Sequence, residues 1–285
     1  MIELLVYVLD YEDNYWIVEQ IDNEIKGFKV YEVDKNGNRY NNITKKNYSK
    51  AKFQKLEIIP VYKRVFKPND FYLEKKTLLT GVWKKYVEAL NKIGIKDKDI
   101  GIFGSYLVGF DITKDVDFVI YGEDNLYKYY ENNEFIKEYT NSTYINEKHI
   151  MHQYNKHSTY HHKDTDLLEI IKRNWSGIQV DEDVLSTPRF IDRDKQHQSL
   201  DTDDKKEITF EVIDGFKTAM LPRRATVLLN GKEYTLETCI WKYQSFLRRG
   251  DVVNCYASVN EKLKVILLEK EKSYVKFIKK GNEIK

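Results

Sequence analysis

Residues 101–122 read Gly101-Ile-Phe-Gly104-Ser105-Tyr-Leu-Val-Gly109-Phe-Asp111-Ile-Thr-Lys-Asp115-Val-Asp117-Phe-Val-Ile-Tyr-Gly122. The first half predicts a short buried strand, a tight turn at Gly104 and Ser105, and a short helix whose free backbone N–H groups face the turn. Such a helix end attracts phosphate, and the missing side chain of Gly104 lets a triphosphate approach the backbone. The loop lacks the lysine of a Walker sequence, so it is not a P-loop.

The second half presents two carboxylates on a predicted strand. Side chains alternate along a strand, so Asp115 and Asp117 project from the same face of the apolar run 115–121. Two such carboxylates repel each other unless cations lie between them. Hard oxygen ligands suit Mg²⁺ or Mn²⁺, and acids that bridge two such ions are typical of phosphoryl or nucleotidyl transfer.

The order of these features resembles the signature of the polymerase-β-like nucleotidyltransferase superfamily. The amino-acid sequence of this stretch is similar to that of uncharacterised, mostly archaeal, predicted nucleotidyltransferases with β-rich flanking segments. The specific part of this resemblance covers residues 100–122. The resemblance implies an α+β fold, with a core of a mixed sheet and helices. It also implies that Gly104, Ser105 and Gly109 bind the nucleotide and that Asp115 and Asp117 hold the metal. Gly-Ser turns and solvated Asp-x-Asp pairs are each common, so only their combination is informative.

A third carboxylate on a later strand completes the superfamily pattern, where it helps to hold a metal and activates the attacking hydroxyl. The candidates are Asp183 and Asp192, which bracket a predicted strand at 184–191 and also fit solvated turn positions. Pro188 removes a ladder donor from that strand, which predicts an edge position or a bulge. Asp111 is a reserve ligand that fits a loop or cap position more simply.

Composition sets the outer limits. A chain of 285 residues is long enough for two or three small domains, and 41% hydrophobic residues indicate a folded protein. The 47 basic and 45 acidic residues leave a charge of +2, which argues against a protein that coats nucleic acid through an overall basic field. Cys239 and Cys255 lack any metal-binding or redox spacing and are typical of reduced core residues.

The N-terminal apolar run contains an early acid and is too short for a signal peptide, and the chain has no run of about 18 apolar residues. We therefore expect a cytoplasmic protein without a membrane partner.

The order of predicted elements suggests three parts: a β-rich segment at 1–67, a nucleotidyltransferase core at 68–204, and a C-terminal part at 205–285. Helices are predicted at 71–93, where Gly94 is the stop signal, and at 124–139, 143–160 and 165–175.

The last part contains five strand-like runs, at 208–213, 225–229, 234–241, 251–259 and 263–268, with Asn230-Gly231 as a hairpin turn. They predict a small closed barrel of the OB-like type, which binds oligonucleotides on an exposed face. The candidate stacking and phosphate-binding side chains are Arg223, Arg224, Tyr243, Phe246, Arg248 and Arg249. The alternative is a structural barrel with solvated basic turns.

Five of the six histidines fall at positions 149, 152, 157, 161 and 162. On one helix they form two pairs that point in different directions, and no zinc motif accompanies them, so the pattern argues against a physiological zinc site. A phosphate contact or a proton carrier is the alternative.

The first functional hypothesis is an Mg²⁺- or Mn²⁺-dependent nucleotidyltransferase that transfers a nucleoside monophosphate from a nucleoside triphosphate to a hydroxyl acceptor. Nothing in the motif identifies the acceptor, although the flanking β segments favour RNA or DNA ahead of protein. The second is an inactive protein of the same fold that binds nucleotide or nucleic acid. A nucleotide-modifying toxin or antiphage factor is a third class.

Overall fold

The computed structural model describes residues 4–21, 24–51, 57–110, 116–158, 166–179, 185–193, 205–238, 243–268 and 273–282. The chain divides into two compact units. The first contains Met1–Thr143 and Ile178–Gln196, and the second contains Tyr144–Gly177 and His197–Lys285. These units group residues by spatial contact, and the three-part division of the sequence remains a prediction.

The first unit begins with an antiparallel sheet, the N-terminal sheet, in the order β4-β5-β3-β2-β1-β7, with β6 paired to β3. Its strands are β1 (Tyr7–Asp10), β2 (Tyr15–Ile21), β3 (Ile25–Val33), β4 (Arg39–Tyr40), β5 (Asn47–Lys50), β6 (Glu57–Ile58) and β7 (Tyr62–Phe66). Their aromatic residues form a core that extends beyond the sheet. The Phe110 ring lies 4.7 Å from that of Tyr31 and 5.6 Å from that of Tyr48, measured between centroids. The N-terminal sheet thus packs directly against the end of residues 101–110, which we call the Gly-Ser segment.

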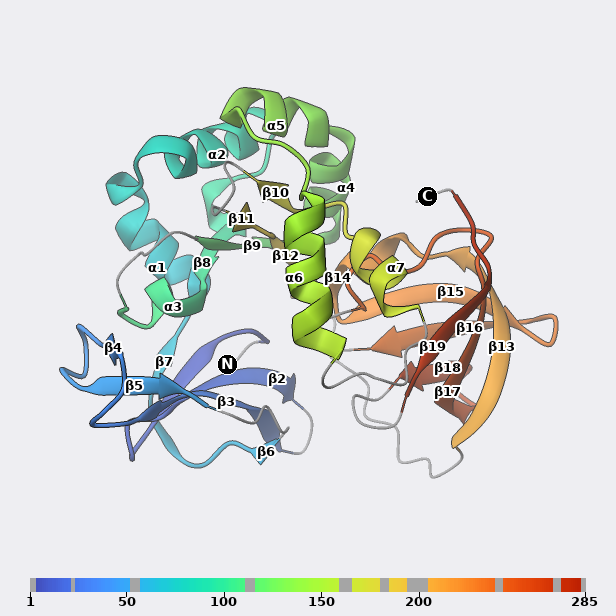
Figure 1. The fold of residues 1–285 in the computed structure, drawn as a ribbon, viewed down its shortest axis with the longest axis horizontal. Coiled ribbons are helices and arrows are strands. Elements are labelled where there is room, and N and C mark those ends of the chain that lie inside the picture. Colours follow the sequence, from blue (N-terminus) through green and yellow to red (C-terminus); the bar gives the residue numbers. More distant parts are fainter. Residues whose placement is uncertain are drawn as a thin grey trace. The chain divides into compact units, whose positions relative to one another are not determined.

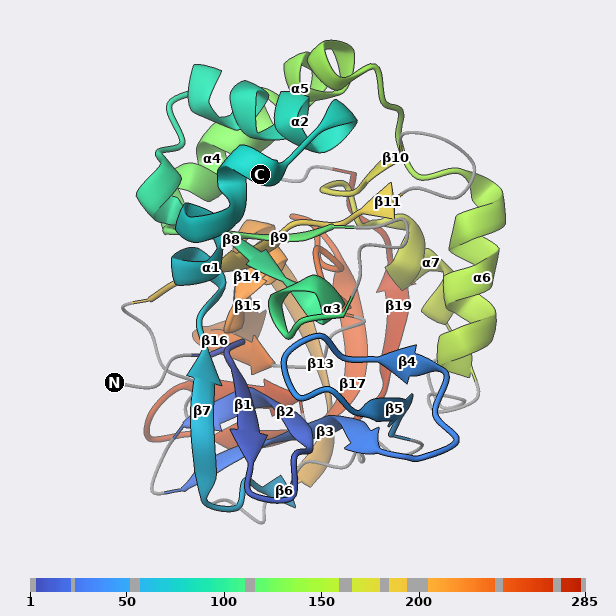
Figure 2. The same cartoon turned by 90° about the vertical axis from the view of Figure 1, so that its left-hand side faces the viewer.

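The second layer of this unit is the core sheet. Strand β9 (Asp117–Tyr121) pairs antiparallel with β8 (Ile100–Phe103) and parallel with β12 (Arg189–Ile191). Phe118 faces α2, where it contacts Trp83 and Tyr86 with ring centroids 6.0 and 4.8 Å away. Because side chains alternate, Asp117 and Val119 face the opposite way. Figures 1 and 2 show α2, α4 and α5 on one side of the core sheet and the N-terminal sheet on the other.

The helices of this unit only partly follow the sequence pattern. They are α1 (Pro68–Lys75), η1 (Lys76–Leu78), α2 (Gly81–Lys92), η2 (Asp97–Asp99), α3 (Gly104–Leu107), α4 (Glu123–Glu131) and α5 (Asn133–Thr140). The single helix expected at 71–93 is wrong, because extended backbone at Leu79 separates α1 and η1 from α2. Its predicted stop is confirmed, since Gly94 has φ +83°. The helix expected at 124–139 is likewise divided, at Asn132.

The predicted strand at 184–191 is two short strands. Ser186 ends β11 (Leu185–Ser186), which pairs with β10 (Ile178–Gln179), and Arg189 begins β12. Pro188 lies between them, where its missing N–H interrupts no ladder.

The second unit contains a closed five-stranded barrel. Strand β13 pairs with β15 and β17, β15 with β16, β16 in parallel with β18, and β18 with β17, which closes the ring. The strands are β13 (Lys205–Asp214), β15 (Arg223–Leu229), β16 (Lys232–Thr238), β17 (Val252–Asn260) and β18 (Val265–Leu268). The predicted barrel and its Asn230-Gly231 turn are confirmed, because both turn residues have positive φ, 51° and 72°.

Other elements accompany the barrel. They are α6 (Glu147–Ser158), α7 (Leu167–Lys172), η3 (Phe216–Ala219), β14 (Met220–Leu221) and β19 (Val275–Lys279). Strand β19 pairs with β17 and was not predicted. Ile170 of α7 joins the buried apolar core of the barrel. Within the described residues, no helix is both long and apolar enough to cross a membrane.

Candidate functional site

The structure brings Gly104 and Asp117 together. Phe103, the last residue of β8, pairs with Asp117 across the β8–β9 ladder, and the chain turns into α3 at Gly104. Gly104 has φ +75°, and a Cβ atom there would overlap the carboxylate oxygen Oδ2 of Asp117. The turn therefore favours glycine for its backbone conformation, and any side chain at this position would displace the Asp117 carboxylate.

The rest of the Gly-Ser segment packs on the N-terminal sheet. Ser105 is half-buried and is the second residue of α3, and its carbonyl accepts a hydrogen bond of 3.1 Å from the Phe110 backbone. Gly109 has φ +91°, and a Cβ atom there would lie 2.6 Å from Cγ1 of Ile43. The Gly109 carbonyl accepts a hydrogen bond from the Asn42 backbone at 2.8 Å. Packing against residues 42–43 thus explains why residue 109 is glycine, and a contact with a nucleotide is not needed to explain it.

Three of the predicted acids, Asp111, Asp115 and Asp183, lie outside the described residues. Asp192 follows β12 at the far end of the core sheet, where the Gly122 backbone N–H donates to the Ile191 carbonyl. Strand β12 runs parallel to β9, so Asp192 lies about five positions beyond Asp117, or roughly 16 Å along the strands. A metal that contacts Asp117 is out of reach of Asp192, and its prediction as the third acid is therefore wrong.

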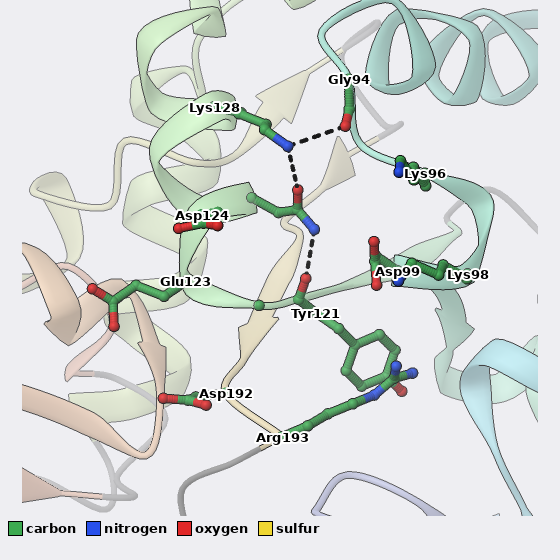
Figure 3. Close-up of a pocket in the computed structure, with 12 residues that line it drawn as sticks. Gly94, Lys96, Lys98, Asp99, Tyr121, Glu123, Asp124, Lys128, Asp192 and Arg193 are labelled. Carbon is green, nitrogen blue, oxygen red and sulfur yellow. Dashed lines mark hydrogen bonds between the residues drawn. The ribbon is translucent and has the colours of Figure 1, made fainter.

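Asp192 instead lines a pocket of about 590 Å³ between the end of β9, the start of α4 and the segment 94–99 (Figure 3). In this pocket Lys128 Nζ donates to the Gly94 carbonyl at 3.2 Å and to Asn125 Oδ1 at 3.3 Å. The Arg193 guanidinium lies 3.6 Å from the Tyr121 ring centroid. The lining carries charges of both signs and none of the predicted metal or nucleotide ligands except Asp192.

The strand beside Asp117 presents a cation. Arg189 pairs in parallel register with Val119, so its side chain lies on the same face of the core sheet as Asp117. Its guanidinium carbon is 5.3 Å from the Phe103 ring centroid. Burial lowers the pKa of the Arg189 guanidinium, and the nearby groups Asp117, Glu19 and Tyr7 oppose this shift. The described part of β12 thus carries a cation near Asp117 and no acid.

The N-terminal sheet forms the other wall of this site. Tyr7 is 2% exposed, and its ring centroid lies 5.1 Å from that of Phe103. Burial raises the pKa of Tyr7, and the charges of Tyr31 and Asp117 act in the same direction. Glu19 on β2 is 4% exposed. The sequence pattern did not predict Glu19 or Arg189 as site residues, because they lie far from the motif along the chain.

The described residues contain no group of three His, Cys, Asp or Glu side chains that could hold a metal ion. On α6, the rings of His149 and His152 are 6.0 Å apart, and the Gln153 amide nitrogen lies 3.1 Å from Nε2 of His149. The side chains of the other three clustered histidines lie outside the described set. The Asp117 carboxylate has the hard oxygen ligands that Mg²⁺ prefers, and its position against the Gly104 turn suits a metal bound to a triphosphate.

The predicted stacking surface on the barrel requires a correction. Tyr243 and Phe246 are both 0% exposed, and they stack on each other with ring centroids 4.7 Å apart inside the barrel core. Arg223 is 1% exposed, and Nε of Arg224 donates to Glu237 at 2.7 Å. These aromatic rings therefore offer no face to a base. Arg248 is half-buried and Arg249 is exposed.

Comparison with known families is consistent with the geometry of the motif. Residues 83–173 match the family model of the nucleotidyltransferase domain, which spans α2, the Gly104 turn, β9 and α4 to α7. No curated protein and no solved structure matches the chain significantly. The match supports nucleotidyl transfer as the general activity, while similarity to the archaeal group remains a prediction.

Proposed function

We propose that this protein is a divalent-metal-dependent nucleotidyltransferase that transfers a nucleoside monophosphate from a nucleoside triphosphate to a hydroxyl group. The observation that carries the proposal is the contact between the Gly104 turn and the Asp117 carboxylate, within a segment that matches a nucleotidyltransferase domain. The contact supports the proposal because it sets a glycine turn, which suits the approach of a phosphate, beside a carboxylate of the kind that holds Mg²⁺.

Asp117, together with Asp115, would hold the Mg²⁺ or Mn²⁺. A bound metal would neutralise charge on the triphosphate oxygens. The Gly104 turn and the Ser105 hydroxyl orient the triphosphate. The acceptor oxygen then forms a bond to the α-phosphorus, the bond from that phosphorus to the β-phosphate oxygen breaks, and pyrophosphate leaves with the electron pair. The acceptor's proton passes to a nearby base or to solvent.

We further propose that the acceptor is RNA or DNA and that the barrel is of the OB-like type. The support is its strand order: numbered along the chain, its strands form the ring 1-2-3-5-4-1, with strands 3 and 5 parallel. Barrels of the OB type bind oligonucleotides through strands 2 and 3 and the adjacent loops. Exposed Arg249 is a candidate phosphate contact, whereas the buried Arg223 and Tyr243 have no part in this proposal.

The test is transfer of an α-³²P-labelled nucleoside monophosphate in the presence of Mg²⁺ or Mn²⁺. Each of the four ribonucleotides is offered with total RNA, single-stranded DNA or protein extract. Asp117→Ala and Asp115→Ala should each lower transfer roughly a hundredfold or more, because each removes a metal ligand. Asp192→Ala is the matched control, since this acid lies at the other end of the core sheet, and it should retain transfer within about twofold.

If the wild-type protein binds labelled nucleotide but transfers it to none of these acceptors, the proposal fails and the inactive, nucleotide-binding alternative holds. If Asp192→Ala abolishes transfer as strongly as Asp117→Ala, the position assigned to the metal is wrong.

A further inference from the structure

The face of the core sheet that carries Asp117 also carries Arg189, and Glu19 of the N-terminal sheet is a third charged group near them. The Arg189 guanidinium has Asp117 and Glu19 among the charged groups that act on it, and these two acids come from different sheets. Arg189 thus lies near two carboxylates, and it is part of the later strand on which the superfamily pattern predicts a third acid.

The position of Arg189 is held from several directions. Its backbone is part of the parallel β9–β12 ladder, and its guanidinium lies over the Phe103 ring. The Phe103 ring is itself packed against the ring of Tyr7 from β1. The Nε atom of Arg189 is buried, although the residue as a whole is half-buried. The β9–β12 ladder, the Phe103 ring and the burial of Nε together restrict how far the Arg189 side chain can move away from Asp117.

Glu19 is positioned by the N-terminal sheet. It belongs to β2, which is paired on both sides, with β1 and with β3, and its side chain is buried. A buried carboxylate is costly unless a cation compensates its charge, and Glu19 is among the acidic groups whose charge acts on Arg189. The planar guanidinium can donate several hydrogen bonds in fixed directions, so it can serve two carboxylates at once.

We propose that Arg189 is a positioning residue for Asp117, and that Glu19 holds Arg189 in place. Arg189 orients the Asp117 carboxylate against the Gly104 turn and reduces the negative charge of the metal site. This inference rests on the proposed function, because it assigns Asp117 to the metal.

The consequence concerns metal affinity. A positive charge close to Asp117 weakens the binding of a free divalent cation, because the two repel each other. A triphosphate brings negative charge of its own, which offsets that repulsion. The metal therefore binds weakly to the free protein and tightly together with the nucleotide.

The experiment measures binding of Mn²⁺ alone from the electron paramagnetic resonance signal of the free ion. The variants are Arg189→Met, Arg189→Lys and Glu19→Gln, with circular dichroism as the check of folding. Arg189→Met should bind Mn²⁺ about tenfold more tightly, because it removes a charge near a divalent ion. Arg189→Lys keeps the charge and should stay within about threefold of the wild type. Glu19→Gln removes a negative charge and should bind Mn²⁺ more weakly.

Nucleotidyl transfer gives the second readout. Arg189→Met should lower kcat despite its tighter Mn²⁺ binding, because Asp117 loses its orienting partner, and Arg189→Lys should restore part of kcat. Arg193→Met is the matched control: it removes an arginine at the far end of the core sheet and should leave Mn²⁺ affinity unchanged.

The inference is overturned if the Arg189→Met variant folds but binds Mn²⁺ with unchanged or weaker affinity. If this variant does not fold, Arg189→Lys decides the question, because an ammonium group cannot reproduce the planar contacts of the guanidinium, and a kcat equal to that of the wild type is the contrary result. Failure of the proposed function is distinguishable, because the wild-type protein then transfers no label while the Mn²⁺ measurements still report on the charge of the site.

Discussion

At the scale of single residues, Gly104 joins the two halves of the motif. Several glycines in this protein have positive φ, but their surroundings differ. Gly104 has φ +75° and its missing Cβ leaves space for the Asp117 carboxylate, whereas Gly231 has φ +72° and nothing within 4 Å of the position of a Cβ. An alanine substitution at each position therefore distinguishes the effect of backbone strain, which both share, from the effect of overlap with Asp117, which only position 104 has.

We predict that Gly104→Ala strongly lowers nucleotidyl transfer and that Gly231→Ala does not. Both variants should lose about 1–2 kcal/mol of unfolding free energy, because alanine disfavours a positive φ. Only Gly104→Ala displaces Asp117, so only this variant should lose nucleotidyl transfer, by roughly a hundredfold. Urea unfolding and label transfer measure the two effects. Equal transfer by both variants would show that the Asp117 position is not critical.

At the scale of elements, the short helix α7 is attached to the barrel by a buried ion pair. Arg173, which follows α7, is 2% exposed and donates from Nη1 to Asp251 Oδ2 at 2.6 Å and to the Phe246 carbonyl at 3.0 Å. Asp251 is 0% exposed and also accepts hydrogen bonds from the backbones of Arg248 and Gly281, both at 2.7 Å. This carboxylate thus connects a helix with two loops of the barrel.

We predict that Arg173→Met lowers the free energy of unfolding by about 3–5 kcal/mol, because it leaves the Asp251 charge buried without its cation. Lys280→Met is the control. Its ammonium group lies 3.2 Å from Glu169, but half of its side chain is exposed (50%), so its loss should cost under about 1 kcal/mol. Urea unfolding of both variants measures the difference. A cost of under about 1 kcal/mol for Arg173→Met would mean that Asp251 is satisfied by its backbone donors alone.

At the scale of the whole molecule, the N-terminal sheet and the core sheet share one hydrophobic core within the first unit. Phe110 is 4% exposed and contacts three tyrosines of the N-terminal sheet, with the Tyr15 ring centroid at 6.2 Å. The Asn41 side-chain amide donates to the Val108 carbonyl at 2.6 Å. The N-terminal sheet therefore supports the segment that carries the Gly104 turn.

We predict that Phe110→Ala lowers the free energy of unfolding of the first unit by about 3–5 kcal/mol, as expected for a large cavity. Amide hydrogen exchange in β2 and β3 should accelerate, because both strands lose packing against this ring. Phe135→Ala is the control, since this side chain is 37% exposed and should cost about 1 kcal/mol or less. Unchanged exchange in β2 and β3 would show that the N-terminal sheet is stable without this contact.

The sequence predicted the features that depend on neighbouring residues. The helix stop at Gly94 and the hairpin turn at Asn230-Gly231 follow from the positive φ that these residues tolerate, and the five barrel strands follow from alternation of apolar residues. The break after Leu78 was missed because its apolar spacing still fits one continuous helix. Tyr243 was misplaced because an aromatic residue a few positions before two arginines gives no sign of whether it faces the core or the surface.

By itself, the sequence predicted the nucleotidyltransferase motif within residues 100–122 and the barrel strands, because both depend on patterns that extend over a few tens of residues at most. The family match at residues 83–173 supports the first prediction, and the strand pairing confirms the barrel. Only the tertiary structure decided what surrounds Asp117. The parallel pairing of β9 with β12 places Asp192 at the far end and Arg189 near Asp117, and the packing of the N-terminal sheet adds Glu19. Contacts between residues that are 70 to 170 positions apart depend on the register and packing of whole sheets, which no local pattern encodes.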